Sequence, residues 1–334
     1  MILIISQERY ETSTDDVIDW IGHLKGNFIR INGEDIYSDK GVPAFSLTTQ
    51  AGGLTPWKAL QSKKINIAWF RRWSAKRYLD KLHLTSGGIS GHMIEAYKTL
   101  VADDATLRSY FLYNLRVKKW LSFPPRVTVN KLIVLDMAQK AGLAVPDTIV
   151  CGNKKELEQF LQQGDRVITK DLTNPFVLQF PDGDKYMSFT KEVDQQFMIE
   201  LPESFAPSLF QKMIPKSYEI RTFFLGKKFY SMAIFSQQSE QTSVDFRNYN
   251  AKKPNRTVPY KLPAHIEQRL RKLMRQLKLD TGSIDIIRTE GPEGYIFLEV
   301  NPIGQFGMTS RPCNYNLEKI IAQYLIQQDQ DGKE

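Results

Sequence analysis

Short runs of apolar residues, in several of which polar residues take every second position, recur along this chain and predict its strands. Two of these runs, residues 283–287 and 295–300, are rich in β-branched and aromatic side chains and flank a turn at 291–294 that contains glycine and proline. This arrangement predicts two antiparallel strands joined by a turn. Further runs predict strands at residues 1–5, 27–31, 65–70, 148–150, 167–170, 209–214, 218–225 and 228–235.

Apolar residues at helical spacing predict the helices between these strands. A helix over residues 15–24 lies between the first two strands, which favours a small lobe with a largely parallel sheet. The longest helix is expected over residues 89–120, before Pro124 and Pro125, which no helix interior tolerates. Further helices are expected over residues 131–141, 155–163, 262–279 and 317–328.

The two prolines mark the first domain boundary, and the fold class is a mixture of α/β and α+β. We expect an amino-terminal α/β lobe over residues 1–124, a central subdomain over 125–207 and a carboxyl-terminal subdomain over 208–334. The central subdomain should carry a projecting hairpin over residues 175–193. There, aromatic and polar residues alternate around the turn Pro181-Asp-Gly-Asp184.

Composition sets the broad class of the protein. The 334 residues are 42% hydrophobic and 11% aromatic, enough for ordinary cores, and no apolar stretch approaches membrane-spanning length. The apolar start, residues 1–5, predicts a first strand rather than a targeting segment. Two cysteines are too few for a disulfide framework and favour a reducing cytoplasm.

The net charge of +8 favours anionic partners such as nucleotides or acidic peptides. Basic clusters are present, for example around residues 118–120, but they lack a helix-turn-helix, a zinc finger or an aromatic RNA-binding motif. We therefore expect neither a nucleic-acid partner nor a membrane partner.

Three oxygen-bearing side chains, Asp285, Glu299 and Asn301, are the strongest chemical signal in the chain. Side chains two apart in a strand share a face, so Glu299 and Asn301 point the same way, and a paired Asp285 faces them across the hairpin. Magnesium is held by one or two carboxylates together with waters and phosphate oxygens, which fits this set. The alternative, a solvated face of alternating polar residues, stays open on the spacing alone.

The rest of the chain decides between these readings. Lys131 begins a predicted helix and Lys170 ends a predicted strand, and each could neutralise phosphate oxygens. They are followed by the apolar strand 209–214, the hairpin that begins at Tyr218-Glu-Ile-Arg221, and the terminal set of metal ligands. This ordered series resembles the ATP-grasp ligases over residues 125–330, and residues 1–120 are similar to the lobe that precedes the ATP-grasp domain in those enzymes.

The resemblance implies a fold in which two α+β subdomains clamp ATP and Mg²⁺. It assigns the ATP phosphates to Lys131 and Lys170, and the ribose hydroxyls to Glu219. A glycine-rich phosphate loop of the GxxxxGK[ST] type is absent from the sequence, consistent with a different grip on phosphate. The same resemblance implies adenine contacts from Gln211, Lys212, Met213 and Ile214. It also implies Mg²⁺ contacts from Asp285, Glu299 and Asn301, with Asn301 binding the nucleotide as well.

A closer resemblance concerns the substrate. Four motifs in the amino-terminal lobe and one near residue 245 are similar to those of graspetide synthetases, the ATP-grasp maturases of microviridin-type and grasp-with-spasm peptides. These motifs are Ile4-Ile-Ser-Gln7, Val17-Ile-Asp-Trp20, Arg30-Ile-Asn-Gly-Glu-Asp-Ile36, Trp69-Phe-Arg-Arg72 and Val244-Asp-Phe-Arg247. The resemblance implies an ATP-dependent ligase that joins Glu or Asp side chains of a ribosomal precursor peptide to Ser or Thr hydroxyls, giving ω-esters, or to Lys amines.

Phosphorylation of the peptide carboxylate followed by attack of the hydroxyl needs cationic groups beside the transferred phosphate. Arg221 and Arg247 are the candidates, and Asp245 is a candidate to orient the nucleophile or the arginine. For Arg221, a salt bridge with Glu219 is the structural alternative, because residues two apart in a strand share one face.

The expected partner is a precursor peptide with a leader and a core that contains Thr or Ser and Glu or Asp. The hairpin at 175–193 and the following residues 194–207 are the expected place of leader capture, unless the hairpin is only the lid of the ATP clamp. Related maturases are commonly dimeric, which implies a homodimer by resemblance. The rival reading is an ATP-grasp carboxylate–amine ligase acting on small molecules or on a protein terminus.

Overall fold

The computed structural model describes residues 1–36, 60, 63–73, 91–161, 164, 166–173, 177–179, 185–188, 190–237, 254–290 and 294–333. The chain forms two compact units: unit 1 is Met1–Pro124 with Asn316–Glu334, and unit 2 is Pro125–Tyr315. Among the described residues, no helix combines the length and the apolar content that crossing a bilayer requires.

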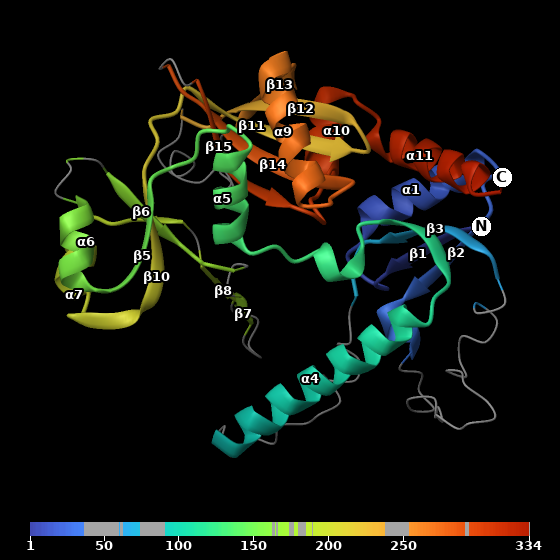
Figure 1. Ribbon diagram of the computed structural model, residues 1–334, viewed down its shortest axis with the longest axis horizontal. Coiled ribbons are helices and arrows are strands. Elements are labelled where there is room, and N and C mark those ends of the chain that lie inside the picture. Colours follow the sequence, from blue (N-terminus) through green and yellow to red (C-terminus); the bar gives the residue numbers. More distant parts are fainter. Residues whose placement is uncertain are drawn as a thin grey trace. The chain divides into compact units, whose positions relative to one another are not determined.

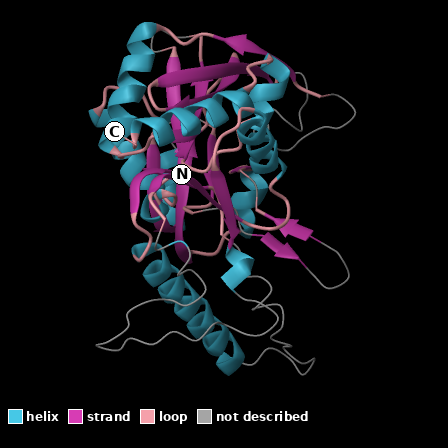
Figure 2. Ribbon diagram, turned by 90° about the vertical axis from the view of Figure 1, so that its right-hand side faces the viewer, coloured by secondary structure: helices cyan, strands magenta, loops and turns pink. Residues whose placement is uncertain are grey.

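Unit 1 is built on a four-stranded parallel sheet of order β2-β1-β3-β4. Figure 1 labels its strands β1, β2 and β3, and Figure 2 shows the strands of the chain in magenta and the helices in cyan. The inner strands β1 and β3 are buried at every position, as expected for a parallel sheet covered on both faces. The sequence predicted three of these strands. The strands are β1 (Ile2–Ser6), β2 (Phe28–Asn32), β3 (Ile65–Phe70) and β4 (Val117–Leu121).

The last helix of the chain belongs to unit 1. Helix α11 (Leu317–Asp331) packs against α1 (Thr12–His23) and against strands of the parallel sheet. Its apolar stripe, which includes Ile321 and Leu325, is fully buried, as are Val17 and Ile21 on α1. Residues 316–334 therefore fold with the amino-terminal lobe, whereas the sequence placed them in the carboxyl-terminal subdomain.

The helix expected over residues 89–120 is shorter than predicted. Helix α4 spans Gly91–Tyr113, and after residues 114–116 the chain enters strand β4 instead of continuing as helix. Strand β4 pairs in parallel with β3, so that Trp120 lies opposite Ala68. The prediction was wrong at this end because tertiary pairing with β3 overrides the local helical pattern.

The smaller sheet of unit 2 has the order β5-β10-β6-β9. Helices α6 (Lys154–Leu161) and α7 (Gln195–Glu200) contribute Leu157 and Phe197 to its apolar core. The expected boundary at residue 207 falls inside β10, which is continuous. The strands are β5 (Thr148–Asn153), β6 (Val167–Lys170), β9 (Lys191–Glu192) and β10 (Ser204–Lys212).

The expected hairpin at 175–193 is confirmed in its inner part. Strands β7 (Val177–Gln179) and β8 (Lys185–Met187) pair antiparallel as a separate two-stranded sheet. The turn between them lies outside the described residues. The end of the expected segment does not extend the hairpin, because β9 pairs with β6 of the neighbouring sheet.

A five-stranded antiparallel sheet of order β13-β12-β11-β14-β15 forms the rest of unit 2. Helices α5 (Lys131–Lys140) and α9 (Ala264–Gln276) lie against it in Figure 1 and form the core of one face. The short helix α10 (Gly307–Cys313) packs near Met232 and Ile234 on the other face. The strands are β11 (Tyr218–Leu225), β12 (Lys228–Phe235), β13 (Arg256–Tyr260), β14 (Thr281–Arg288) and β15 (Tyr295–Asn301).

Candidate active site

Three charged side chains form a row across the middle of the five-stranded sheet. The strand register places Arg221 opposite Asp285, and Asp285 opposite Glu299. Directly opposite residues of an antiparallel pair project from the same face. The guanidinium of Arg221 donates to both carboxylate oxygens of Asp285, at 3.1 and 3.2 Å. The sequence prediction that Asp285 faces Glu299 across a hairpin is confirmed.

A β-bulge makes this row possible. The register between β14 and β15 shifts after Asp285, because Ile286 lies opposite Phe297 rather than Leu298. In a regular strand Phe297 and Glu299 would share a face. The extra residue turns the buried Phe297 into the core with α5 and α9 and leaves Glu299 on the side of Arg221. Bulges often redirect side chains next to functional sites in this way.

Asn301 lies two residues beyond Glu299 and opposite Ser283. Its Oδ1 atom accepts a hydrogen bond from the backbone N–H of Ile303 at 3.1 Å, and its carbonyl accepts one from Gly304 at 3.0 Å. A Cβ atom on Gly304 would lie 2.1 Å from the Oγ atom of Ser283. Only glycine therefore lets this turn fold back on β14 and hold Asn301.

A narrow cavity of about 90 Å³ opens beside the row of charges. Its walls come from β6, from the end of β10 and the residues that follow it, and from β11, β14 and β15. Its polar lining combines cations with carboxylates, and its apolar lining suits a flat ring. The polar lining residues are Lys170, Thr190, Gln211, Lys212, Lys216, Glu219, Arg221, Asp285 and Glu299, and the apolar ones include Ile168, Met213, Ile214, Ile220, Ile234, Ile286, Ile287 and Leu298.

A second cavity of about 560 Å³ shares the wall formed by Leu298 and Glu299. Its volume is in the range of small-molecule sites. Lys131, Thr173 and Asn301 also line it. The predicted metal ligands are thus divided: Asp285 faces the first cavity, Asn301 the second, and Glu299 borders both.

The two predicted phosphate-binding lysines border different cavities. Lys170 lines the first and Lys131 the second. Lys131 nevertheless reaches toward the end of β6, since its ammonium donates to the carbonyl of Asp171 at 2.9 Å. The structure therefore brings both lysines to the same end of β6.

The predicted adenine-facing segment, Gln211 to Ile214, contributes all four residues to the first cavity. Hydrogen bonds hold it from both sides. The Gln211 amide donates to the Thr148 hydroxyl at 2.9 Å, and the backbone N–H of Met213 donates to the carbonyl of Arg166 at 2.7 Å. Lys212 forms an ion pair of 3.4 Å with Asp147.

Glu219 is buried in the wall of the first cavity, and its partner is not the one considered from sequence. Its Oε1 atom accepts hydrogen bonds from the Lys216 ammonium and, at 3.2 Å, from the Ser236 hydroxyl. Arg221 pairs with Asp285 instead. Burial raises the pKa of the Glu219 carboxyl above its ordinary value, and Lys216 opposes this shift. Lys216 and Ser236 were not predicted.

The donor set fits magnesium better than a softer metal. Among the described residues, no group of three or more His, Cys, Asp or Glu side chains could hold a metal ion. Two carboxylates and an amide oxygen, with phosphate and water completing the shell, are the usual surroundings of Mg²⁺. Asp285, Glu299 and Asn301 carry oxygens of these kinds, and their assignment as Mg²⁺ ligands stays a prediction.

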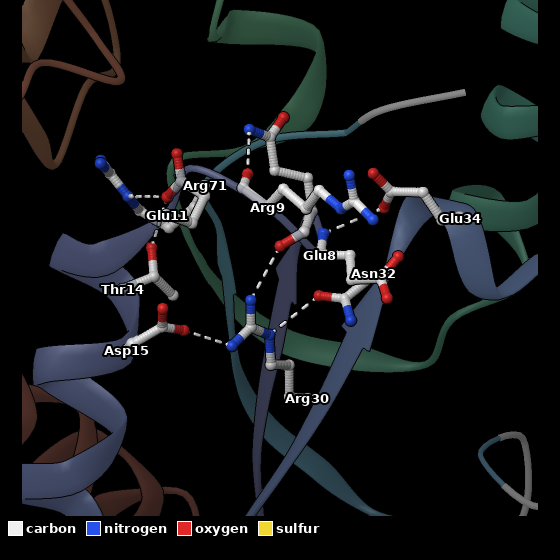
Figure 3. A network of polar contacts seen from close by, with 10 residues as sticks. Glu8, Arg9, Glu11, Thr14, Asp15, Arg30, Asn32, Glu34 and Arg71 are labelled. Atoms are coloured by element: carbon white, nitrogen blue, oxygen red, sulfur yellow. Dashed lines mark hydrogen bonds and ion pairs between the residues drawn. The ribbon is translucent and has the colours of Figure 1, made fainter. Parts of the chain in front are cut away.

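Two predicted catalytic residues, Asp245 and Arg247, lie outside the described residues. The amino-terminal motifs are described. Motif residues Arg30, Asn32, Glu34 and Arg71 lie in a network of polar contacts (Figure 3), whereas the motif Val17-Ile-Asp-Trp20 lies within helix α1. Glu11 lies at the centre of one cluster, where it accepts from Thr14 at 2.6 Å and pairs with Arg72 and, at 3.8 Å, with Arg71. Burial lowers the pKa of the Arg71 guanidinium to about 10, although Glu11 opposes the shift.

Arg30 forms the centre of the neighbouring cluster in Figure 3. It donates to Asp15 at 2.5 Å, to Asn32 at 2.8 Å and to the carbonyl of Gln7 at 2.8 Å. These contacts tie the first strand, the first helix and the second strand together. The motif that begins at Arg30 therefore has a structural role in unit 1.

No protein-family model and no curated protein matches the chain. Solved structures do. The macrocyclase MdnC bound with precursor peptide MdnA, from Microcystis aeruginosa MRC, is 27% identical with a TM-score of 0.75, over 98% of this chain and 99% of that one. A RiPP-associated ATP-grasp ligase of Chryseobacterium gregarium, in complex with ADP and a leader and core peptide, is 24% identical with a TM-score of 0.76, over 97% and 95%.

A third solved structure, the ATP-grasp ligase PsnB complexed with minimal precursor, Mg and ADP, is similar in fold alone. It is 14% identical with a TM-score of 0.72, over 98% of this chain and 96% of that one. All three similarities span nearly the whole length of both chains. Unit 1 and unit 2 are therefore both parts of the shared fold.

Proposed function

We propose that this chain, which has the fold of the RiPP-associated ATP-grasp ligases, is an ATP-dependent macrocyclase that closes rings in a ribosomal precursor peptide. In this proposal it joins Glu or Asp side chains of the peptide to Ser or Thr hydroxyls as ω-esters, or to Lys amines as ω-amides. The observation that carries the proposal is the row Arg221, Asp285 and Glu299, which borders a cavity walled by the residues 211–214.

A peptide carboxylate is a poor acyl donor, because attack on it would have to expel an oxide or hydroxide. Transfer of the γ-phosphoryl group of ATP to the carboxylate gives an acyl phosphate and ADP. The peptide hydroxyl then attacks the carbonyl carbon, its proton is lost, and phosphate leaves. The net change in the peptide is the loss of one water for each ring.

In this proposal the residues that line the two cavities have separate roles. Lys131 and Lys170 neutralise phosphate oxygens, and residues 211–214 face the adenine ring. Asp285, Glu299 and Asn301 would hold Mg²⁺, which when bound screens the charge on the phosphates. Phosphoryl transfer depends on positioning and charge neutralisation rather than on covalent help from the protein.

Arg221 is the residue that we propose to act on the reacting groups. Its Nη1 atom holds Asp285, while its Nε atom donates to no atom of the described part of the chain. A planar guanidinium has five N–H donors. One that holds a carboxylate through a single nitrogen can also donate to oxygens of a phosphate, or to the oxyanion that forms during hydroxyl attack. Arg247 and Asp245 remain predictions for the same steps.

The precursor peptide is the proposed partner. The solved structures of MdnC, of the Chryseobacterium ligase and of PsnB contain precursor, leader or core peptides, which supports this assignment. The pair β7–β8 is the proposed place of leader capture, because two short strands leave edges that an extended peptide can join. Homodimerisation and a cytoplasmic setting stay predictions.

The test combines the purified protein, ATP, Mg²⁺ and a synthetic precursor whose core contains Thr and Glu. We expect peptide-dependent release of ADP and a peptide mass that falls by one water for each ring, located by tandem mass spectrometry between Thr and Glu. A core in which each Glu is replaced by Gln should give neither result, because an amide side chain cannot be phosphorylated in this way.

The rival activity has a different outcome. If ADP release is stimulated by free amino acids or by short peptides with an amine, and the product gains mass by ligation instead of losing water within one peptide, the protein is a carboxylate–amine ligase. Absence of any peptide-dependent ADP release with a cognate precursor would overturn the macrocyclase proposal.

A further inference from the structure

The carboxylate of Glu219 is held at one oxygen only. Lys216, which precedes β11, and Ser236, which follows β12, both donate to Oε1. Ser236 is fully buried, and the Lys216 and Glu219 side chains are 7% and 9% exposed. Buried groups of opposite charge that also share a hydroxyl donor have little freedom to turn. The orientation of the carboxylate is therefore fixed by two residues outside its own strand.

The other oxygen is available. Oε2 is buried and has no hydrogen-bond partner among the described residues. A buried acceptor without a donor is costly and rare in folded proteins, which suggests that a bound molecule supplies the donor. Glu219 borders the same cavity as residues 211–214, so this donor belongs to a molecule that also reaches the proposed adenine-facing segment.

The charge on Lys216 matters for this arrangement. An ionised carboxylate in a buried wall needs a compensating cation, and the nearby Arg221 is committed to Asp285. Lys216 supplies that cation on the side of Oε1. Because Lys216 binds Oε1, the carboxylate does not turn Oε2 toward the lysine. Oε2 can therefore accept a hydrogen bond from a bound molecule.

We propose that Lys216 and Ser236 are positioning residues that aim Oε2 of Glu219 at a ribose hydroxyl, so that the cavity selects ribonucleotides over deoxyribonucleotides. This inference rests on the proposed use of ATP by the same cavity. It does not depend on the identity of the peptide. A nucleotide without the hydroxyl would leave Oε2 unpaired, whereas ATP satisfies it.

The experiment measures nucleotide binding without any peptide, by displacement of a fluorescent ATP analogue with ATP, 2′-deoxy-ATP or 3′-deoxy-ATP. We expect the wild-type protein to bind at least one deoxy analogue about 10- to 100-fold more weakly than ATP, the range of a hydrogen bond to a charged group. In Lys216→Met and Ser236→Ala the preference for ATP should shrink toward equality. Lys216→Arg should restore part of it.

A purely structural role for Lys216 has a distinct signature. It would weaken ATP and both deoxy analogues by the same factor and leave their ratio unchanged. Lys140→Met, which removes an exposed lysine paired with Asp136 on α5, is the matched control and should change neither affinity nor ratio.

Two outcomes separate this inference from the proposed function. If the wild-type protein does not bind ATP at all, the proposed function fails together with it. If ATP binds but both deoxy analogues bind equally well, or if Lys216→Met keeps the full preference, only the positioning role is overturned. In steady-state assays with peptide, Lys216→Met should raise the KM for ATP while kcat changes little.

Discussion

Arg221 and Asp285 lie directly opposite each other on β11 and β14, and one guanidinium nitrogen contacts both carboxylate oxygens. The two side chains are only 9% and 16% exposed, so their interaction is weakly screened by solvent. The pair therefore links a candidate metal ligand to a candidate phosphate-binding group. A substitution of either residue should therefore change the hydrogen bonding of the other.

Replacing Arg221 with Gln should lower kcat for peptide-dependent ADP release by about 10²- to 10³-fold, the usual effect of removing a donor that stabilises transition-state charge. The measurement is ADP release at saturating ATP, Mg²⁺ and peptide. Arg275→Gln, an exposed arginine on α9, is the control and should behave as wild type. Near-normal kcat in Arg221→Gln would remove the residue from the mechanism.

Glu299→Gln should raise the Mg²⁺ concentration needed for half-maximal activity by about tenfold or more, because a carboxylate ligand becomes a neutral one. Glu299→Ala and Asn301→Ala should abolish cyclisation. Leader binding, followed by fluorescence anisotropy of a labelled leader peptide, should be unaffected. Glu203→Gln on the surface of unit 2 serves as the control, and retained turnover in the alanine variants would contradict their role as metal ligands.

Gly304→Ala should destabilise the protein by about 2 kcal/mol or more, because the new methyl group would collide with Ser283 at 2.1 Å. Gly307→Ala is a closely matched control, since nothing lies within 4 Å of its added Cβ, and it should change stability by no more than about 0.5 kcal/mol. Urea denaturation measures both. Equal effects would show that the turn at Asn301 tolerates a side chain.

Stability should depend on pH through Glu219. Its pKa is raised in the folded protein above the ordinary value of 4.5, so the folded state binds this proton more tightly than the unfolded state. The contribution to stability is complete below pH 4.5 and is lost as the pH rises through the raised pKa. The free energy of unfolding of the wild type, relative to Glu219→Gln, should therefore fall with increasing pH in that window. A flat difference would contradict the shift.

Cys151 and Cys313 should react slowly with a thiol reagent in the native protein. Burial raises the pKa of both thiols, which lowers the fraction of reactive thiolate at any given pH, and both side chains are shielded. Titration with a chromogenic disulfide at pH 8 measures the rate. In denatured protein both thiols should react with the reagent at once. Rapid reaction of the native protein would contradict the burial of the two side chains.

The pairing of β14 with β15 could be predicted because turn residues and β-branched runs are local signals. The bulge could not, since it depends on how Phe297 packs against α5 and α9. Lys216 stands three residues before Glu219 in the sequence, a spacing that signals a local ion pair only once Glu219 is known to be buried. Ser236 reaches Glu219 only through the register of β11 with β12. Contacts that depend on this kind of long-range packing cannot be recognised in a single sequence.

The return of α11 to the amino-terminal sheet has a consequence for the order of folding. Unit 1 is assembled from two segments that 191 intervening residues, Pro125–Tyr315, separate along the chain. During synthesis the ribosome releases all of unit 2 before it releases α11, so unit 2 has every residue it needs while the apolar face of α1 still lacks its cover. Until α11 emerges, the apolar face of α1 stays exposed on the nascent protein, and chaperones could bind there.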